Sequence, residues 1–307
     1  MPTPTLLVLD TPSLYFRAFY GIPETMTAAD GSPVNAVRGL IDMVAFLLQK
    51  YRPGRLVATM DADWRPAFRV AAVPSYKTHR LAPQGGEEVP DALSPQVPVI
   101  EQVLAAVGVP VVGVPGYEAD DVIGTLACAC EGPVDVVTGD RDLFQLVDAD
   151  KPVRVLYTAK GLRDMQIVDE AEVARRYGIP GRCYADFALL RGDPSDGLPG
   201  VAGVGEKTAA GIVNRYGDTE SLLAALDSGA VDGLSPSVRA KLVAARDYLV
   251  AAVPVVRVAR DVPVPSYDDR VPAAPRDPEA LVALADRWNL DSPLSRLLAA
   301  LAAVGVG

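Results

Sequence analysis

Acidic side chains are the residues of this 307-residue sequence whose spacing suggests chemistry most directly. Glu118, Asp120 and Asp121 stand almost side by side, and Asp140 and Asp142 form a second close group. One Asp commonly caps a helix or closes a turn, so each acid taken alone has a structural explanation. Several like charges at close quarters, however, cost stability unless cations neutralise them. We therefore expect these groups to bind metal ions.

The single histidine and the spacing of the three cysteines exclude several other classes of catalytic site. His79 is the only histidine, which excludes a Ser-His-Asp triad, a Cys-His pair and a histidine-rich zinc site. The spacing of Cys128 and Cys130 fits neither a common zinc knuckle nor a redox pair, and we expect them and Cys183 to be reduced thiols in the core. An enzyme with this sequence must therefore work with carboxylates, lysine, arginine and metal.

Five apolar runs predict buried strands, and helix-like stretches follow them. The runs are Thr5–Leu9, Leu56–Met60, Val109–Val114, Val134–Thr138 and Val153–Tyr157. This alternation predicts an α/β fold around a central, mainly parallel sheet. Asp10, Asp61, Asp140 and Glu118 each follow one of these runs, directly or across a short turn. Because function gathers at the carboxyl ends of parallel strands, we expect the acids to share one edge of the sheet.

The chain divides by composition into three parts. We expect an α/β domain over residues 1–178, a module of short helices over 179–253, and a C-terminal segment over 254–307 that packs back on the first domain. Two amphipathic helices are predicted in that segment, at Pro278–Asn289 and Leu294–Val304. Residues 75–95 are rich in Pro, Gly and polar residues, which suggests a functional lid or arch.

A glycine-rich turn, GVGEKTA, lies in the helical module at residues 203–209. It has the form of a helix-hairpin-helix turn, in which Gly203 and Gly205 let backbone N–H groups approach a phosphate at a helix N-terminus. Lys207 and Thr208 follow at the same place. Such turns also serve as simple connectors, so the paired aspartates just before this one strengthen its interpretation.

Charge is unevenly distributed. The net charge is −10 and the isoelectric point is about 4.7, which on composition alone is also typical of an acidic protein without a polyanionic partner. Residues 64–86, in contrast, contain four basic side chains and no acid: Arg65, Arg69, Lys77 and Arg80. No apolar run reaches the roughly 18 residues of a membrane span, and no signal peptide is evident. We expect a cytoplasmic protein that does not bind membranes.

Five blocks of sequence, in order from residue 6 to about 216, resemble one known family. The blocks are LVLDTPSLYFRAFY, MDADWRPAFR with PSYKTHR, GYEADDVIGTLA, VVTGDRDLFQLV and LLRGDPSDGLPGVAGVGEKTA. They are similar to the bacterial flap endonuclease and 5′–3′ exonuclease family, which also forms the N-terminal domain of bacterial DNA polymerase I. The resemblance implies a PIN-like 5′-nuclease fold with a helical arch and a C-terminal helix-hairpin-helix module, here in a standalone chain.

The resemblance also implies a set of metal ligands. A first ion would be bound by Asp10, Asp61, Glu118 and Asp120, and a second by Asp140, Asp142 and Asp196. Two further acids, Asp121 and Asp193, would hold metal-bound waters or lie just outside the direct ligands. Asp120 would stand near both ions. Hard oxygen ligands favour Mg²⁺ or Mn²⁺ over zinc. Members of the family further suggest K⁺ between the hairpin turn and a DNA phosphate.

The resemblance also implies which residues contact DNA. Lys77 and Arg80 resemble arch cations that neutralise developing phosphate charge, Tyr76 is placed to stack on a base, and Arg17 to contact a phosphate. A solvated basic face with a half-buried tyrosine is the alternative for the first three. Pro194, Gly197 and the pair Thr11-Pro12 depart from the family pattern without removing a ligand.

These expectations describe a monomeric nuclease that cuts DNA at 5′ ends and 5′ flaps, RNA-primed ends included, in primer removal, replication and repair. Its two ions would activate a water and stabilise the attacking and leaving oxygens. Two alternatives are a catalytically silent DNA-binding scaffold and a ribonuclease of the PIN type. The first should lack metal ligands and the second should lack the hairpin turn, and neither is missing from the sequence.

Overall fold

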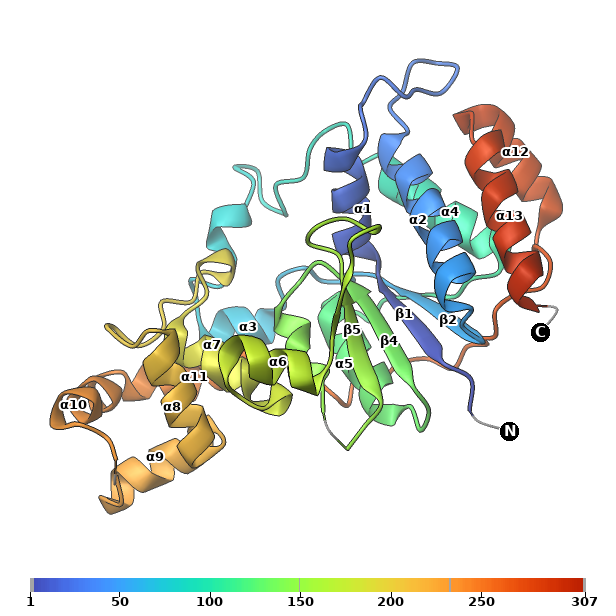
Figure 1. Cartoon of the computed structure of the whole chain (residues 1–307). Coiled ribbons are helices and arrows are strands. Elements are labelled where there is room, and N and C mark those ends of the chain that lie inside the picture. The colour runs from blue at the N-terminus through green and yellow to red at the C-terminus, as the bar shows by residue number, and fades with distance from the viewer. Residues whose placement is uncertain (1–2, 149, 232, 306–307) are drawn as a thin grey trace.

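The fold is built on one six-stranded sheet (Figure 1). The computed structural model describes residues 3–148, 150–231 and 233–305. The strands are β1 (Leu6–Asp10), β2 (Arg55–Thr59), β3 (Val111–Val112), β4 (Val134–Thr138), β5 (Val153–Tyr157) and β6 (Gln166–Val168). Their order in space is β3-β2-β1-β4-β5-β6, and all neighbours pair in parallel except β5 and β6.

The sheet agrees with the sequence prediction in type and largely in position. Two predicted strands, at 134–138 and 153–157, have the predicted bounds, and the first two shift by one residue. The run at 109–114 gives only the two-residue strand β3, because Pro110 cannot donate a ladder hydrogen bond and Gly113 packs against the backbone oxygen of Met60. The short antiparallel strand β6 was not predicted.

Alternating side chains of the central strand β1 divide the core into two parts. Leu7 and Leu9 belong to one cluster, and Leu6 and Val8 belong to the other. The first cluster contains α1 (Thr11–Gly21), α2 (Asn35–Tyr51), α4 (Gln96–Val107), α12 (Pro278–Trp288) and α13 (Asp291–Gly305). The second contains α5 (Ala119–Ala129), α6 (Glu170–Tyr177) and α7 (Tyr184–Arg191). All five residues of β1 are buried, as a strand covered on both faces requires.

A small group of helices extends from one end of this body (Figure 1). It consists of α8 (Glu206–Tyr216), α9 (Thr219–Ser228), α10 (Pro236–Ala244) and α11 (Arg246–Val256). Helix α11 returns toward the α/β body, where it packs against α7 and against the short helix α3 (Ala67–Ala72). The module is therefore joined to the sheet domain through buried contacts.

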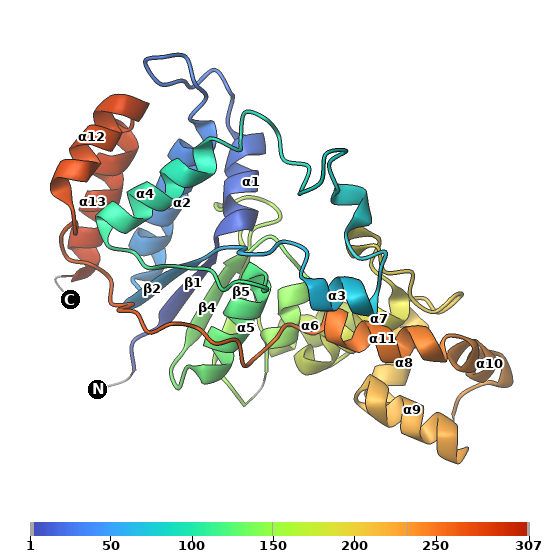
Figure 2. The ribbon, with the colours of Figure 1, turned by 180° about the vertical axis from the view of Figure 1, so that it is seen from behind.

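The C-terminal part of the chain runs back across the α/β body (Figure 2). The backbone N–H of Leu56 donates to the carbonyl of Asp269 at 2.7 Å, and Arg55 forms an ion pair with Asp269 at 2.7 Å. Helices α12 and α13 then cover α4 and α2. The predicted helices at 278–289 and 294–304 correspond to α12 and α13, and α13 starts three residues earlier than predicted.

Residues 75–95, here called the strap, differ from the expected helical arch. All of them are described, and their only helical element is one 3-10 turn at Thr78–Arg80. Beyond it Leu81 and Glu87 form an antiparallel bridge, closed by Gly85 and Gly86 with positive φ. Two glycines and three prolines within this stretch exclude a continuous helix, so the prediction of a helical arch is wrong for this structure.

Two further expectations concern single features. Among the described residues, no helix is both long and apolar enough to cross a membrane. All three cysteines are free, as expected, but only Cys183 is buried, whereas Cys130 is partly exposed and Cys128 is exposed at the end of α5. The expectation of three core thiols is therefore wrong for Cys128 and Cys130.

Candidate active site

The acids that follow the strands are fixed by helix N-termini. Asp10 is the last residue of β1 and caps α1, because its carboxylate accepts from Ser13 N at 3.2 Å. Asp61 lies just beyond β2 and accepts from Ala119 N at 2.7 Å, at the start of α5. Two neighbouring strands and two helices thereby hold these carboxylates at one edge of the sheet.

Five of the nine predicted metal ligands line a single pocket of about 440 Å³. They are Asp10, Asp61, Glu118, Asp120 and Asp140. Lys77 and Arg80 from the strap line the same pocket, together with Glu87, which the sequence analysis did not single out. The pocket therefore combines a wall of carboxylates from the sheet edge with cations that arrive from a different part of the chain.

Glu118 has the most elaborate set of partners in this pocket. Lys77 Nζ lies 2.7 Å from its Oε2, and the hydroxyl of Tyr76 donates to its Oε1 at 2.8 Å. The guanidinium of Arg69 approaches Oε1 at 3.5 Å. Tyr76 is only 2% exposed, so its ring offers no face to a base, and the base-stacking prediction for Tyr76 is wrong in this arrangement. Its hydroxyl instead orients Glu118.

Asp121 points away from the pocket, although it neighbours Asp120. It is fully buried, and both of its oxygens accept from the guanidinium of Arg69 at 2.7 Å. It also accepts from the backbone N–H groups of Glu118 and Ala259, at 3.2 and 2.8 Å. These bonds occupy its oxygens, so the prediction that Asp121 holds a metal-bound water is not supported, and the residue anchors the backbone of Glu118.

A second group of acids lies beside the first. Asp140 Oδ1 accepts from Asp142 N at 2.8 Å, and Asp196 lies 3.5 Å from the guanidinium of Arg80. Asp193 is nearly buried and accepts from Ser195 N at 2.9 Å, at the start of the short helix Pro194–Asp196. The backbone N–H of Lys77 donates to the carbonyl of Asp196 at 3.0 Å, which fastens the strap to this group.

Burial and mutual repulsion raise the pKa of several of these carboxyls. Burial, opposed by hydrogen bonds from Thr138 and Ser13, raises the pKa of Asp10 to about 7. Burial also raises the pKa of Glu118 to about 7, even though Lys77 and Arg69 act in the opposite direction. The pKa of Asp120 and that of Asp142 are raised by burial and then by neighbouring acids, chief among them Asp10 and Asp140.

Carboxylates that are crowded, partly dehydrated and raised in pKa are a donor set suited to a hard divalent cation. The acids nevertheless do not form a complete coordination site. Within residues 3–148, 150–231 and 233–305, no three Asp, Glu, His or Cys side chains already converge closely enough to hold an ion. Lys77 and Arg80 instead balance part of the negative charge, through Glu118 and Asp196. Binding of a cation would therefore require these side chains to draw together.

Arg17 lies at the same edge, on α1. An added Cβ on Gly139 would stand 3.5 Å from its Nη2, which places the guanidinium beside the loop that carries Asp140. Its Nε is buried without a hydrogen-bond partner in the described part of the chain, and burial lowers its pKa. A partly buried cation with an unpaired donor at this position fits an anionic ligand.

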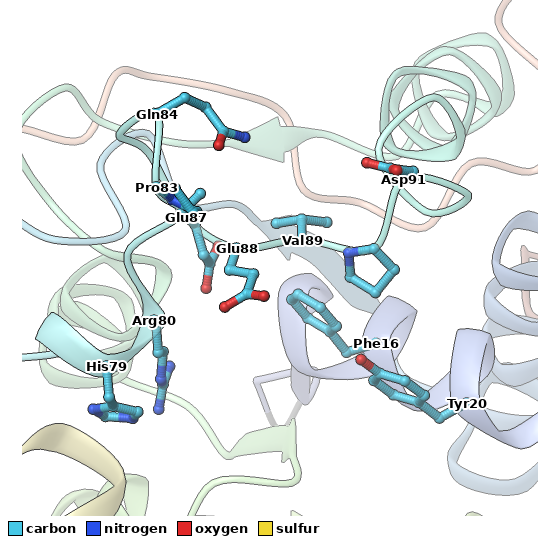
Figure 3. A pocket seen from close by; sticks show the side chains of 12 residues that line it. Phe16, Tyr20, His79, Arg80, Pro83, Gln84, Glu87, Glu88, Val89 and Asp91 are labelled. Carbon is cyan, nitrogen blue, oxygen red and sulfur yellow. The ribbon is translucent and has the colours of Figure 1, made fainter.

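A second, larger opening lies under the strap (Figure 3). It has a volume of about 780 Å³, and Phe16 and Tyr20 of α1 face strap residues across it. Glu87 and Glu88 project from the strap toward this opening, and Arg80 lines both this pocket and the acidic one. The opening therefore adjoins the acidic pocket, with which it shares Phe16, Arg80 and Glu87.

The glycine-rich turn stands at the start of α8, as predicted. Gly203 has a φ of +72° and its carbonyl accepts from Lys241 Nζ at 2.9 Å, while Gly205 precedes the helix without a side-chain cap. Nothing lies within 4 Å of a Cβ built on Gly205, so this face of the turn is open. Lys207 is exposed and Thr208 partly buried in the first turn of α8. An open, uncapped helix N-terminus with two lysines nearby is suited to a phosphate.

Two family models match adjoining parts of the chain. The model described as "5'-3' exonuclease, N-terminal resolvase-like domain" matches residues 5–178, and "5'-3' exonuclease, C-terminal SAM fold" matches residues 179–279. The chain belongs to the 5′–3′ exonuclease family. It is accordingly a nuclease, and the resemblance noted in the sequence is confirmed.

Relatives and solved structures extend this result. A 5′–3′ exonuclease of Streptomyces coelicolor is 57% identical over 97% of this chain and 100% of its own length, and one of Mycobacterium tuberculosis is 51% identical over 96% and 97%. DNA polymerase I of Mycobacterium bovis is 40% identical over 98% of this chain but only 32% of the polymerase. T5 5′-exonuclease with zinc bound has a TM-score of 0.62 at 15% identity, covering 98% of this chain and 99% of that chain. Human GEN1 with Holliday junction DNA has a TM-score of 0.64 at 16% identity, covering 98% and 72%. These two structures share the fold of this family member.

Some residues of the site were not found by sequence reasoning. Arg69 was noted only as part of a basic stretch, and its burial against Asp121 had no local signal beyond its place in the block MDADWRPAFR. Glu87 and Lys241 belong to segments without a recognisable motif, and Gln145 reads as an ordinary polar residue after the second acidic group. Each acts through contacts that are distant in sequence.

Proposed function

We propose that this nuclease cuts DNA at 5′ ends and at 5′ flaps, with divalent cations held by its carboxylates. The observation that carries the proposal is the single pocket in which acids from four strand ends face Lys77 and Arg80 beneath the strap. Work in primer removal, replication and repair, in the cytoplasm and as a monomer, is part of the same proposal.

The residues fit a divalent metal by their chemistry. Asp10, Asp61, Glu118, Asp120 and Asp140 would hold ions at the pocket, with Asp142 and Asp196 beside them and Asp193 supporting the second group. All are oxygen donors, so Mg²⁺ or Mn²⁺ suits them best. When bound, such ions lower the pKa of a water and stabilise charge on the reacting phosphate.

The chain's own cations complete the pocket. Lys77 and Arg80 are held at its rim by Glu118 and Asp196, and a phosphate entering beneath the strap would meet both ammonium and guanidinium groups. Arg17, whose Nε has no partner in the described part of the chain, lies beside the Gly139–Asp140 loop and would add a further positive charge near the pocket. These cations position the scissile phosphate and offset the negative charge that grows during cleavage.

The glycine-rich turn is proposed to hold the duplex away from the site of cleavage. Backbone N–H groups at the start of α8, with Lys207 and Thr208, would bind a phosphate, and K⁺ bound at the same turn would join its carbonyl groups to the DNA. A single strand could then pass under the strap into the acidic pocket. A duplex held at the turn and a single strand under the strap would together favour cutting at a junction between the two.

A cleavage assay tests this function. The purified protein is incubated with a 5′-flapped duplex, a blunt duplex, a duplex with an RNA-primed 5′ end and a single-stranded RNA, each with Mg²⁺, Mn²⁺ or chelator. Cutting that needs metal and concentrates at the flap junction and 5′ ends is expected. Binding without cutting in either metal would identify a DNA-binding scaffold, and cutting of single-stranded RNA alone would identify a ribonuclease.

A further inference from the structure

Two buried side chains donate hydrogen bonds to successive backbone carbonyls at the end of α11. Arg69 Nε donates to the carbonyl of Val255 at 3.1 Å, and Gln145 Nε2 donates to the carbonyl of Val256 at 3.0 Å. The backbone N–H of Val258 then donates to Gln145 Oε1 at 3.1 Å. We call Val255–Ala259 the coupling segment.

Gln145 connects this segment to the second acidic group. The same Nε2 that binds Val256 also donates to the carbonyl of Asp142 at 2.8 Å. Gln145 is 3% exposed, so water cannot easily replace a bond that is broken here. A movement of the coupling segment must therefore move Gln145 and the backbone of Asp142 with it.

Arg69 and Asp121 connect the segment to the first acidic group. Asp121 accepts from Ala259 N and from Glu118 N, while its carboxylate is gripped by both Nη atoms of Arg69. Arg69 also lies 3.5 Å from the carboxylate of Glu118. Arg69 is 2% exposed and Asp121 is fully buried, so water cannot easily replace a broken bond in this linkage either.

The other side of the segment faces α7 of the α/β body and α9 of the helical module. Arg257 pairs with Asp186 of α7 at 2.8 Å and with Glu220 of α9 at 2.6 Å. Helix α11 itself packs on α7 and α9. The coupling segment thus contacts α7 and α9 on one side. On the other side it is bonded to Asp121 of the first acidic group, and through Gln145 it is linked to the backbone of the second.

We propose that the coupling segment transmits the binding of duplex DNA by the helical module to the spacing of the two acidic groups, with Arg69 and Gln145 as positioning residues. This inference rests on the proposed function. No three of these acids converge on an ion in the described residues, so a displacement of α11 that reaches them through Arg69 and Gln145 would change how well they bind one. Coupling of this kind is reciprocal: duplex that tightens cation binding must itself be bound more tightly when the cation is present.

The test measures cation binding without relying on cleavage. Mn²⁺ is titrated into the full chain with and without a dumbbell duplex, a closed strand with no 5′ end to enter the pocket, and free Mn²⁺ is followed by electron paramagnetic resonance. In the unsubstituted protein the dumbbell is expected to tighten Mn²⁺ binding by at least about fivefold. In Gln145→Met, which loses all three bonds, this factor should fall close to one while the dumbbell still binds.

Arg55→Met is the matched control. Like Arg69, Arg55 forms a bidentate pair with an aspartate, although Arg55 is only partly buried. Its partner Asp269 lies on the same C-terminal stretch, and the pair lies at the opposite end of β2 from Asp61. Its coupling factor should equal that of the unsubstituted protein. Arg69→Lys, which keeps the charge and loses the fork, provides a second variant should Gln145→Met fail to fold, and it should also reduce the factor.

Three results would overturn the inference. The first two are no effect of the dumbbell on Mn²⁺ binding in the unsubstituted protein, and an unchanged factor in the folded Gln145 and Arg69 variants. A loss of coupling in Arg55→Met equal to that in Gln145→Met would overturn it as well, because general loosening would then explain both. Failure of the unsubstituted protein to bind either Mn²⁺ or duplex would instead refute the proposed function on which the inference rests.

Discussion

The ammonium of Lys77 lies 2.7 Å from the carboxylate of Glu118. Sequence reasoning assigned the first to phosphate and the second to metal, and the structure pairs them with each other. A bound cation would take over part of the negative charge of Glu118 and free Lys77 to turn toward a phosphate. The pair therefore links the arrival of metal to the availability of the strap cation.

Replacing Lys77 by methionine should slow cleavage of a 5′ flap by about 10²- to 10³-fold at saturating metal, because a cation facing the reacting phosphate is lost. Single-turnover rates on a flapped duplex measure this. Lys50→Met, at the exposed end of α2 far from the pocket, is the control and should retain full activity. A Lys77 variant with a normal rate would remove this residue from the catalytic group.

Asp120→Asn should reduce cleavage by at least about 100-fold while flap binding in chelator stays within about twofold, because Asp120 lines the acidic pocket and not the hairpin turn. Asp63→Asn, which changes an acid near the same edge whose carboxylate accepts only from Arg65 N in the described structure, is the matched control. Cleavage rates and fluorescence anisotropy separate the two effects. Near-normal turnover in Asp120→Asn would contradict its assignment as a metal ligand.

Lys207→Ala should weaken binding of duplex DNA to a similar extent for all sequences and reduce the slope of log affinity against log salt by about one, because one phosphate contact is removed. Affinities measured at four salt concentrations give both quantities. Arg246→Ala removes an exposed cation of the same module that is paired with Asp227, and it should leave the slope unchanged. Equal slopes in all three proteins would rule out Lys207 as a phosphate contact.

Stability in chelator should fall as pH rises from about 4 to about 7. Burial raises the pKa of Asp10 and of Glu118 to about 7, so the folded protein binds protons that the unfolded chain has already released in this window. Asp10→Asn should flatten the decline in Tm between pH 5 and pH 7.5, and Asp286→Asn, on the exposed face of α12, should not. A steeper decline in the Asp10 variant would contradict the direction of its pKa shift.

The sheet and its acidic edge were predictable because local patterns decide them. An apolar run ending in Asp10, or one ending just before Asp140, indicates both a buried strand and where its carboxyl end lies. The hairpin turn was equally visible, since Gly203 and Gly205 can be read from the sequence alone. Periodicity and glycine placement are short-range signals, and they survive in the folded structure.

The rest depended on contacts between distant segments. Asp121 has a local bond from Glu118 N at the start of α5, and the guanidinium of Arg69, 52 residues away, holds it in the core while Asp120 faces the pocket. Tyr76 reads as an exposed aromatic in a basic stretch until Glu118 provides a buried acceptor for its hydroxyl. Tertiary partners determined both outcomes.

Helix α13 packs on α2 although about 250 residues separate them, and Arg296 pairs with Asp42 across that contact at 2.7 Å. During synthesis on the ribosome, α2 and α4 therefore emerge long before the helices that cover them. Their apolar faces, which in the finished fold meet Leu297 and Leu301, stay open to other chains for most of translation. A fragment that stops after residue 253 would keep them open permanently, so we expect it to aggregate where the full chain does not.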